Sequence, residues 1–209
     1  MPDLAALARG LLPAGVAVAG GRIAAWQGVL YPQEEAALTR ARAVRRAEFT
    51  AGRVAARGAL AQLDVASGPL PRDPRGPVLW PDGVTGSLSH GAGLVLAAVA
   101  RRAVVAALGI DIEAAGAAVP LDDIAGPAEI AALGGRDPVI LFSAKEAAYK
   151  AQFALTGRMF GFRDLMLMLG DAHFTAQVPD GPAVAGRWLQ SDGIVLTAAT
   201  LPATVQPIA

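Results

Sequence analysis

The sequence has no cysteine among its 209 residues and no net formal charge, because 18 basic side chains balance 18 acidic ones. The absence of thiols excludes disulfides, thiolate zinc sites and thiol nucleophiles. The charge balance argues against a chain that binds nucleic acid over its whole surface, although a local basic patch is compatible with it. Only two histidines are present, His90 and His173, so a zinc site has weak support.

Long apolar runs are missing as well. Alanine supplies 47 of the residues, and the apolar stretches are cut at Pro13, Gly20–Gly21 and Arg101–Arg102 before they reach the roughly 18 residues of a membrane helix. Asp3 and the lack of a basic stretch ahead of the first apolar segment are not typical of a signal peptide. We therefore expect a cytoplasmic protein without membrane contact, built as one domain or as two small halves.

Lysine is scarce compared with arginine. Of the 18 basic residues 16 are arginine, and the two lysines, Lys145 and Lys150, lie five positions apart. A lysine ammonium is a compact point charge that suits a phosphate oxygen where a planar guanidinium does not fit. The segment 142–150 is thus a candidate for phosphate chemistry. A surface helix with a Ser143–Glu146 capping box and an ion pair from Glu146 to Lys150 is the structural alternative.

The spacing of apolar residues predicts an α+β protein. Residues 33–63 are expected to form one helix or two in line, with a basic ridge that contains Arg42, Arg46, Arg53 and Arg57. Residues 68–86 contain five prolines and predict an extended loop in which Trp80 needs a packing partner. A β-hairpin is expected from 94–100 and 104–113, a helix at 142–154 with Ser143 as N-cap, and strands at 162–169, 174–178, 184–189 and 194–201.

Two carboxylates, Asp111 and Glu113, stand one residue apart at the end of a predicted strand. Side chains two positions apart in a strand share a face, with Cα atoms about 7 Å apart, so both can converge on one hard cation such as magnesium. A strand that ends in polar residues facing water is the alternative, and for an isolated pair it is the more common case.

Ser89 and His90 lie side by side in a glycine-rich turn at 86–91. The turn does not have the Gly-x-Ser-x-Gly spacing of a serine-hydrolase elbow. A hydroxyl beside an imidazole can bind phosphate oxygens, and a structural histidine is the alternative. His173 is flanked by Ala172 and Phe174 and is expected to be structural.

Sequence blocks at 45–60, 80–90, 109–113 (Gly-Ile-Asp-Ile-Glu) and 142–150 (Phe-Ser-Ala-Lys-Glu-Ala-Ala-Tyr-Lys) follow one another in a recognisable order. Together they resemble the Sfp-type 4′-phosphopantetheinyl transferases, with most similarity to the siderophore-synthase and mycobacterial-type branch. The resemblance spans about residues 40 to 170. The blocks taken in order are much more specific than any one of them.

The resemblance implies a monomer of two pseudo-symmetric α+β halves with the active site in the cleft between them. Residues 1–115 would hold the coenzyme A helix, the Pro-rich loop and the hairpin, and residues 116–209 the Lys-Glu-Ala helix and further antiparallel strands. The family transfers the 4′-phosphopantetheine arm of coenzyme A to a serine of an apo acyl or peptidyl carrier protein and releases adenosine 3′,5′-bisphosphate. Fatty-acid, polyketide and non-ribosomal peptide carriers are not distinguished, and docking is expected near 156–162.

The resemblance also implies roles for individual residues. Magnesium would be held by Asp111, Glu113 and Glu146, and Lys150 would contact the pyrophosphate. The attacking hydroxyl must also lose a proton, and our hypothesis is that Glu146 takes it directly or polarises a metal-bound water that takes it. Asp111, Glu146 and Lys150 would therefore form the catalytic group. Coenzyme A would further be contacted by Arg45, Arg53, Arg72, Arg75, Ser89 and His90. Lys145 has no assigned role.

Two other functions are compatible with parts of the sequence. A non-catalytic module that binds coenzyme A or a nucleotide could keep the basic residues, but it would have no need for the acidic trio and Lys150. A nucleic-acid-binding domain could use the arginine helix, but the zero net charge and the lack of aromatics between the arginines argue against it.

Overall fold

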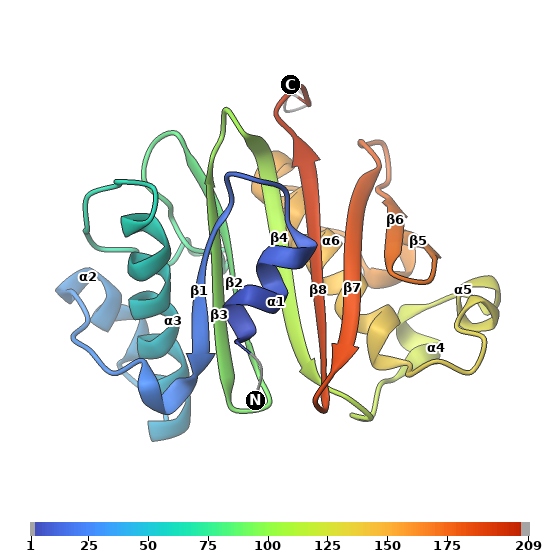
Figure 1. Cartoon of the computed structure of the whole chain (residues 1–209), viewed down its shortest axis with the longest axis horizontal. Helices are drawn as coiled ribbons and strands as arrows, with labels where there is room; N and C mark the ends of the chain where they lie inside the picture. Colours follow the sequence, from blue (N-terminus) through green and yellow to red (C-terminus); the bar gives the residue numbers. More distant parts are fainter. Residues whose placement is uncertain (1–2, 206–209) are drawn as a thin grey trace.

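Two antiparallel sheets form the centre of the protein, whose computed structural model describes residues 3–205 (Figure 1). The first sheet has the order β1-β3-β2, with bounds Ala17–Arg22, Leu94–Arg101 and Val84–Gly91. The second has the order β4-β8-β7-β6-β5, with bounds Val105–Ala114, Ile194–Pro202, Val184–Ser191, His173–Gln177 and Met166–Leu169. The α+β prediction is confirmed.

Three longer helices pack on these sheets: α1 (Leu4–Leu11), α3 (Ala43–Ala61) and α6 (Val139–Thr156). Shorter helical segments are η1 (Ile23–Ala25), α2 (Pro32–Glu35), η2 (Ala36–Leu38), α4 (Leu121–Ile124), α5 (Pro127–Ala132) and η3 (Phe162–Asp164). Within residues 3–205 no helix has the length and apolar character needed to cross a membrane.

The helix expected over 33–63 is divided, because α3 begins only at Ala43. Leu38 and Phe49 share a small apolar cluster with Leu30. In one straight helix Leu38 and Phe49 would lie about 16 Å apart along the axis. The chain must therefore turn between them to bury both in the same cluster. The strand expected over 162–169 likewise starts late, at Met166, after the η3 turn.

Strand β3 is buried on both faces. Its even-numbered residues, such as Leu94 and Leu96, pack in a cluster with α1, whereas Val95 and Val99 pack in a different cluster with α3. The period of two along a strand explains this division. The α1 cluster also contains residues of β4 and β8, so α1 covers a face that both sheets share.

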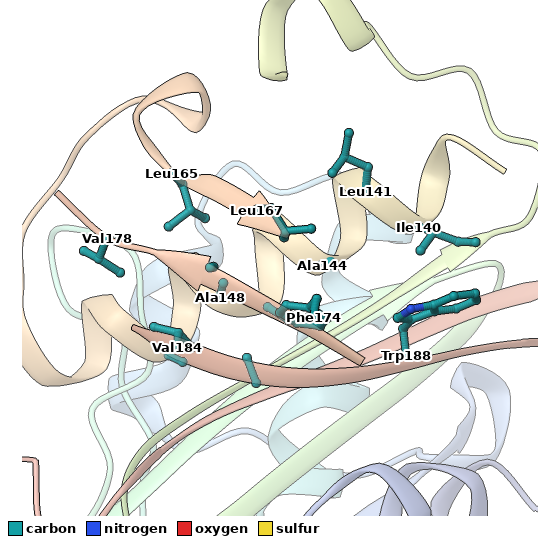
Figure 2. Close-up of a cluster of buried hydrophobic side chains, with 14 of the residues drawn as sticks. Ile140, Leu141, Ala144, Ala148, Leu165, Leu167, Phe174, Val178, Val184 and Trp188 are labelled. Atoms are coloured by element: carbon teal, nitrogen blue, oxygen red, sulfur yellow. The ribbon is translucent and has the colours of Figure 1, made fainter. Parts of the chain in front are cut away.

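Helix α6 packs on β4, β8 and β7, and Figure 2 shows its contacts with the second sheet. Ile140, Leu141, Ala144 and Ala148 of the helix lie in one cluster with Leu165, Leu167, Phe174, Val178, Val184 and Trp188. Gly109 of β4 permits this close approach, because a Cβ atom there would lie 2.0 Å from the carbonyl oxygen of Ala147. The glycine of the Gly-Ile-Asp-Ile-Glu block is therefore a packing requirement.

The hairpin predicted from 94–100 and 104–113 is wrong. Strand β3 pairs with β1 and β2, and β4 pairs with β8 instead. The two strands are consecutive in sequence, but the chain passes from one sheet to the other between them. Alternation of apolar residues identifies a strand and does not select its partner. The division of the chain at residue 115 stays a prediction. Strand β4, which ends just before this point, is hydrogen-bonded to β8 of the second sheet.

The two sheets meet where β2 lies beside β4. Ser87 Oγ accepts a hydrogen bond from Ile110 N at 3.1 Å, and Ser89 Oγ accepts one from Ile112 N at 3.3 Å. Serine side chains thus satisfy backbone donors that a neighbouring strand carbonyl would otherwise satisfy. A Cβ atom at Gly91 would lie 2.2 Å from the Ile112 carbonyl oxygen. The turn predicted at 86–91 is wrong, because these residues belong to strand β2 and pair with β3. The junction places Ser89 and His90 of β2 against the carboxylate strand.

Ser143 is not the N-cap of the lysine-bearing helix, so that prediction is wrong. The helix starts at Val139, and the Val139 backbone N donates a hydrogen bond to Asp137 Oδ1 at 3.0 Å. Ser143 is fully buried one turn later, with its Oγ 2.9 Å from Thr197 Oγ1. Residues 139–141 are apolar and belong to the core, and this burial extends the helix beyond its local capping signal.

Candidate active site

A cleft of about 1000 Å³ separates α3 and the 72–80 loop from α6 and the segment after it. Eight of the ten residues predicted for the site line this cleft: Arg45, Arg53, Arg72, Arg75, Ser89, His90, Glu146 and Lys150. The remaining two, Asp111 and Glu113, are on β4 and are not part of its lining. Residues far apart in sequence are therefore gathered at one place between the two halves.

Asp111 is the most deeply buried of the predicted site residues, with 3% of its surface exposed. Its Oδ1 accepts hydrogen bonds from Ser89 Oγ at 2.9 Å and from Lys150 Nζ at 2.7 Å. Its Oδ2 is buried and has no hydrogen-bond partner among residues 3–205. A buried carboxylate oxygen without a partner is costly. This oxygen is therefore available to a cation or to a donor.

Lys150 connects the two acidic elements of the site. Its Nζ donates to Asp111 Oδ1 and, at 3.1 Å, to the Ile110 carbonyl oxygen. Glu146 Oε2 lies 3.7 Å from the same nitrogen, at the i, i+4 spacing that the sequence suggested. The ion pair of the structural alternative is thus present, but it lies inside the cleft and includes a buried aspartate from another element.

Burial raises the pKa of Glu146, and Asp111 adds to this while Lys150 opposes it. Burial also raises the pKa of Glu113 to about 6, with a further contribution from Asp111. Crowded hard oxygen donors and the unpaired Asp111 Oδ2 fit the chemistry of a divalent cation such as magnesium. However, no group of three or more His, Cys, Asp or Glu side chains within residues 3–205 is arranged to hold a metal ion.

The raised pKa of Glu113 predicts a pH-dependent stability. Between its ordinary value of 4.5 and about 6, the folded state binds more protons than the unfolded state, so the free energy of unfolding falls as pH rises through this window. Glu113→Gln should therefore raise the free energy of unfolding at pH 7 by up to about 1 kcal/mol, allowing for solvent screening. Urea unfolding with a chelator should show this gain vanish below pH 4.5. If the free energies of unfolding of wild type and variant differed by the same amount at every pH, the prediction would be wrong.

Arg53 forms a buried cationic part of the cleft. Its Nε donates to the Leu70 carbonyl oxygen at 2.7 Å, and its guanidinium carbon lies 4.1 Å from the centre of the Phe49 ring. Burial lowers its pKa to about 10, so it remains charged at neutral pH. Among residues 3–205 only Nε has a hydrogen-bond partner, which leaves the two terminal nitrogens for an anion.

Arg45 and His90 contact each other at the opening of the cleft. Arg45 Nη1 lies 2.7 Å from His90 Nε2, and a guanidinium can only donate, so this ring nitrogen is the acceptor. Burial lowers the pKa of His90, and Arg45 and Lys150 lower it further, against the opposing effect of Glu48. The imidazole is therefore neutral here, and the positive charge of the pair belongs to Arg45.

The Pro-rich loop carries the other two arginines. Arg72 Nε donates to the Gly76 carbonyl oxygen at 2.9 Å, which closes the loop on itself. Arg75 Nε donates to Asp73 Oδ1 at 3.1 Å, and its guanidinium carbon lies 5.5 Å from the centre of the Phe153 ring on α6. The loop thus reaches across the cleft to the second half.

The predicted basic ridge of α3 is not a single binding surface. Arg46 is bound to Glu35 at 2.8 Å and Arg57 to Glu34 at 2.8 Å, so both belong to structural ion pairs. Arg42 is not part of the cleft lining. Arg53 is thus separated from the other ridge residues and lines the cleft, and its contact with coenzyme A stays a prediction.

An aromatic cluster on the α6 side was missed by the sequence reasoning. Tyr149 and Phe160 have ring centres 5.3 Å apart, and Phe153 and Phe162 lie within 6.2 Å of Tyr149. All four line the cleft. The i, i+4 spacing of Tyr149 and Phe153 was a signal for part of this cluster. We call these four residues the aromatic wall.

Comparison with known proteins shows the family of this chain. Residues 33–100 match the family described as the 4′-phosphopantetheinyl transferase N-terminal domain. The 4′-phosphopantetheinyl transferase Svp of Streptomyces mobaraensis is 42% identical over 195 residues, which cover 81% of this chain and 78% of that protein. The 4′-phosphopantetheinyl transferase PptT of Mycobacterium tuberculosis is 38% identical over 194 residues, which cover 81% of this chain and 85% of that protein. Enterobactin synthase component D of Escherichia coli K12 is 33% identical over 181 residues, covering 82% and 84%. The chain therefore belongs to the 4′-phosphopantetheinyl transferase family, as its sequence blocks indicated.

Proposed function

We propose that this chain transfers the 4′-phosphopantetheine arm of coenzyme A to a serine hydroxyl of an apo acyl or peptidyl carrier protein and releases adenosine 3′,5′-bisphosphate. The observation that carries the proposal is the position of Lys150, bound to Asp111 and beside Glu146, in a cleft with four predicted coenzyme A arginines. Phosphoryl transfer needs cations at the phosphates and a carboxylate near the hydroxyl that attacks.

The two sides of the cleft suit different parts of coenzyme A. Within residues 3–205 the two terminal nitrogens of Arg53 have no hydrogen-bond partner, and Arg72 and Arg75 lie on the loop beside it, so this side suits the nucleotide phosphates. The aromatic wall carries no charge and suits the neutral pantetheine arm. Ser89 already donates its hydroxyl proton to Asp111, so its predicted contact with a phosphate requires release of that bond.

The reaction joins the serine oxygen to the β-phosphorus and breaks the bond from this phosphorus to the oxygen of the departing adenosine bisphosphate. We assign the hydroxyl proton to Glu146, a carboxylate that lines the cleft with its Oε2 3.7 Å from Lys150 Nζ. Lys150 donates two of its three N–H groups to Asp111 and Ile110. The third, on the side of the Glu146 carboxylate at 3.7 Å, would donate to a pyrophosphate oxygen.

We assign magnesium to Asp111, Glu113 and Glu146, which would have to draw together on binding the ion, because within residues 3–205 they are not arranged as a metal-holding group. The assignment is supported by Asp111 Oδ2, which has no hydrogen-bond partner among these residues, and by the raised pKa of both glutamates. When bound, the ion neutralises charge on the transferring phosphoryl group. Docking of the carrier protein near residues 156–162 remains a proposal, supported by Met159, which lines the cleft and is 71% exposed. The monomeric state and cytoplasmic location remain predictions from the sequence.

The test is to mix the purified protein with coenzyme A, magnesium and a panel of apo carrier proteins, and to record intact masses. At least one carrier should gain the mass of one phosphopantetheine arm, and a chelator should prevent this gain. Binding of coenzyme A with no mass gain on any carrier would favour the non-catalytic binding module. Salt-sensitive binding to oligonucleotides would instead favour a nucleic-acid-binding domain.

Glu146→Gln should lower kcat by about a hundredfold or more, because the amide cannot accept the hydroxyl proton. The dissociation constant of coenzyme A should change much less. Steady-state rates with a carrier that wild type modifies would measure the first quantity and calorimetry the second. Glu35→Gln, which alters an exposed ion pair with Arg46, is the matched control. Normal turnover of the Glu146 variant would refute its role as base.

A further inference from the structure

Two short helices, α2 and α5, carry the same device in different halves of the protein. Each has proline at the first helical position and a buried glutamate at the third, Glu34 in α2 and Glu129 in α5. Glu34 Oε2 accepts from the Tyr31 N at 2.9 Å, and Glu129 Oε2 accepts from the Gly126 N at 2.9 Å. One carboxylate oxygen thus caps the glutamate's own helix, and the other is available to a different element.

The second oxygen makes equivalent contacts in both halves. Glu34 Oε1 accepts from Leu70 N at 2.9 Å and from Arg57 Nη1 at 2.8 Å. Glu129 Oε1 accepts from Leu167 N at 2.9 Å and lies 2.8 Å from Lys145 Nζ. In each half a glutamate therefore joins a short helix, a distant backbone segment and a cation from the long helix that borders the cleft. The two halves therefore share one hydrogen-bond pattern.

The Glu34 network leads to the cationic side of the cleft. Leu70, whose N–H is bound to Glu34, accepts the hydrogen bond from Arg53 Nε at 2.7 Å through its carbonyl oxygen. Two residues later the chain reaches Arg72. Glu34 is 0% exposed and does not line the cleft, so it can affect a ligand only through Arg53 and the loop.

The Glu129 network leads to the aromatic wall. Lys145 Nζ, held by Glu129, also donates to the Phe162 carbonyl oxygen at 3.0 Å and to the Ile124 carbonyl oxygen at 2.7 Å. The Phe162 ring centre lies 6.1 Å from that of Tyr149. Neither Glu129 nor Lys145 lines the cleft. Both therefore act on the cleft through the backbone of Phe162.

This network also explains one of the two lysines in a chain whose other 16 basic residues are arginine. Three oxygen atoms, from Glu129, Ile124 and Phe162, surround one nitrogen of a side chain that is 0% exposed. An ammonium has three donors around a single point, whereas a guanidinium spreads its donors over a planar fork. Lys145 therefore has a structural requirement for lysine that is independent of phosphate binding.

We infer that Glu34 and the Glu129–Lys145 pair are equivalent positioning residues, each of which holds one side of the cleft in place for one part of coenzyme A. Glu34 positions the cationic side for the nucleotide phosphates, and the Glu129–Lys145 pair positions the aromatic wall for the pantetheine arm. The inference rests on the proposed function, because it takes coenzyme A as the ligand. It predicts that the two networks affect binding of different parts of one molecule.

The experiment compares two ligands by calorimetry: adenosine 3′,5′-bisphosphate, which has only the nucleotide part, and intact coenzyme A. Glu34→Gln should weaken binding of both about tenfold. The double variant Glu129→Gln/Lys145→Met removes both members of the buried pair, so no lone charge is left inside. It should weaken coenzyme A about tenfold and change binding of the bisphosphate less than about twofold. In steady-state assays both variants should raise KM for coenzyme A more than they lower kcat.

Glu35→Gln is the control, since Glu35 follows Glu34 directly and its ion pair with Arg46 is exposed. Urea unfolding shows which variants are folded. If a glutamine variant is unfolded, Glu34→Asp and Glu129→Asp keep the charge but shorten the reach, and the same pattern is expected with smaller changes. Folded variants that bind both ligands with normal affinity would overturn the inference. So would a folded Glu129→Gln/Lys145→Met protein whose affinity for the bisphosphate falls as much as its affinity for coenzyme A. A wild-type protein that binds neither ligand would instead contradict the proposed function.

Discussion

Asp111→Asn is expected to lower kcat/KM for phosphopantetheinyl transfer by about a thousandfold or more. Asparagine keeps the shape of the side chain but removes the charge that holds Lys150 Nζ at 2.7 Å. It also replaces one carboxylate oxygen with an amide nitrogen, which cannot bind a cation. The variant should therefore lose both the position of the lysine and the response to magnesium. Rates measured by intact mass over a range of magnesium concentrations would show both effects.

The matched control is Asp122→Asn, at an exposed position in the first turn of α4. It should retain full activity, which would separate a local loss from a general effect of removing one negative charge. An Asp111→Asn protein with more than about a tenth of wild-type activity would contradict the central role of this residue. So would a variant whose magnesium dependence is unchanged.

Gly109→Ala is expected to lower the free energy of unfolding by about 4 kcal/mol, among the largest effects of a single methyl group. The added Cβ would lie 2.0 Å from the Ala147 carbonyl oxygen and 2.7 Å from the Ala151 backbone nitrogen. Both atoms belong to the backbone of α6 and cannot rotate away. The helix would have to move from β4 and would carry Glu146 and Lys150 with it. Urea unfolding would measure the loss of stability.

Gly10→Ala provides the opposite case. Gly10 lies in α1, and apart from its chain neighbours and the backbone of its own helix no atom of residues 3–205 is within 4 Å of the Cβ that alanine would add. Because alanine is the better helix former, the free energy of unfolding should stay the same or rise by up to about 1 kcal/mol. If Gly109→Ala proved as stable as Gly10→Ala, the close contact between β4 and α6 would not be a requirement of the fold.

Much of the fold could be predicted wherever a pattern is local to one element. The strands expected at 174–178, 184–189 and 194–201 correspond to β6, β7 and β8, because alternating or continuous apolar runs identify strands. The starts of helices and the partners of strands could not be predicted in the same way. Ser143 had the pattern of an N-cap, but burial of residues 139–141 extended the helix past it. Strand β4 was expected to pair with its neighbour in sequence, and it pairs with β8.

The sequence by itself determined which chemical groups are present and how they are spaced within one element. A period of two placed Asp111 and Glu113 on one face of a strand, and a spacing of four placed Glu146 beside Lys150 on a helix. The order of the blocks then indicated the family, which the relatives confirmed. None of this depends on how the elements pack.

Only the tertiary structure decided which groups meet across elements. Lys150 and Asp111 are 39 positions apart, and they touch because Gly109 admits α6 against β4. The tertiary structure also gave different surroundings to the two lysines, which composition alone had singled out together. Lys150 lies in the cleft, whereas Lys145 is buried on Glu129. The physical reason is that helix and strand periods set only the direction of a side chain relative to its own backbone, while burial and its polar partners depend on packing against distant segments.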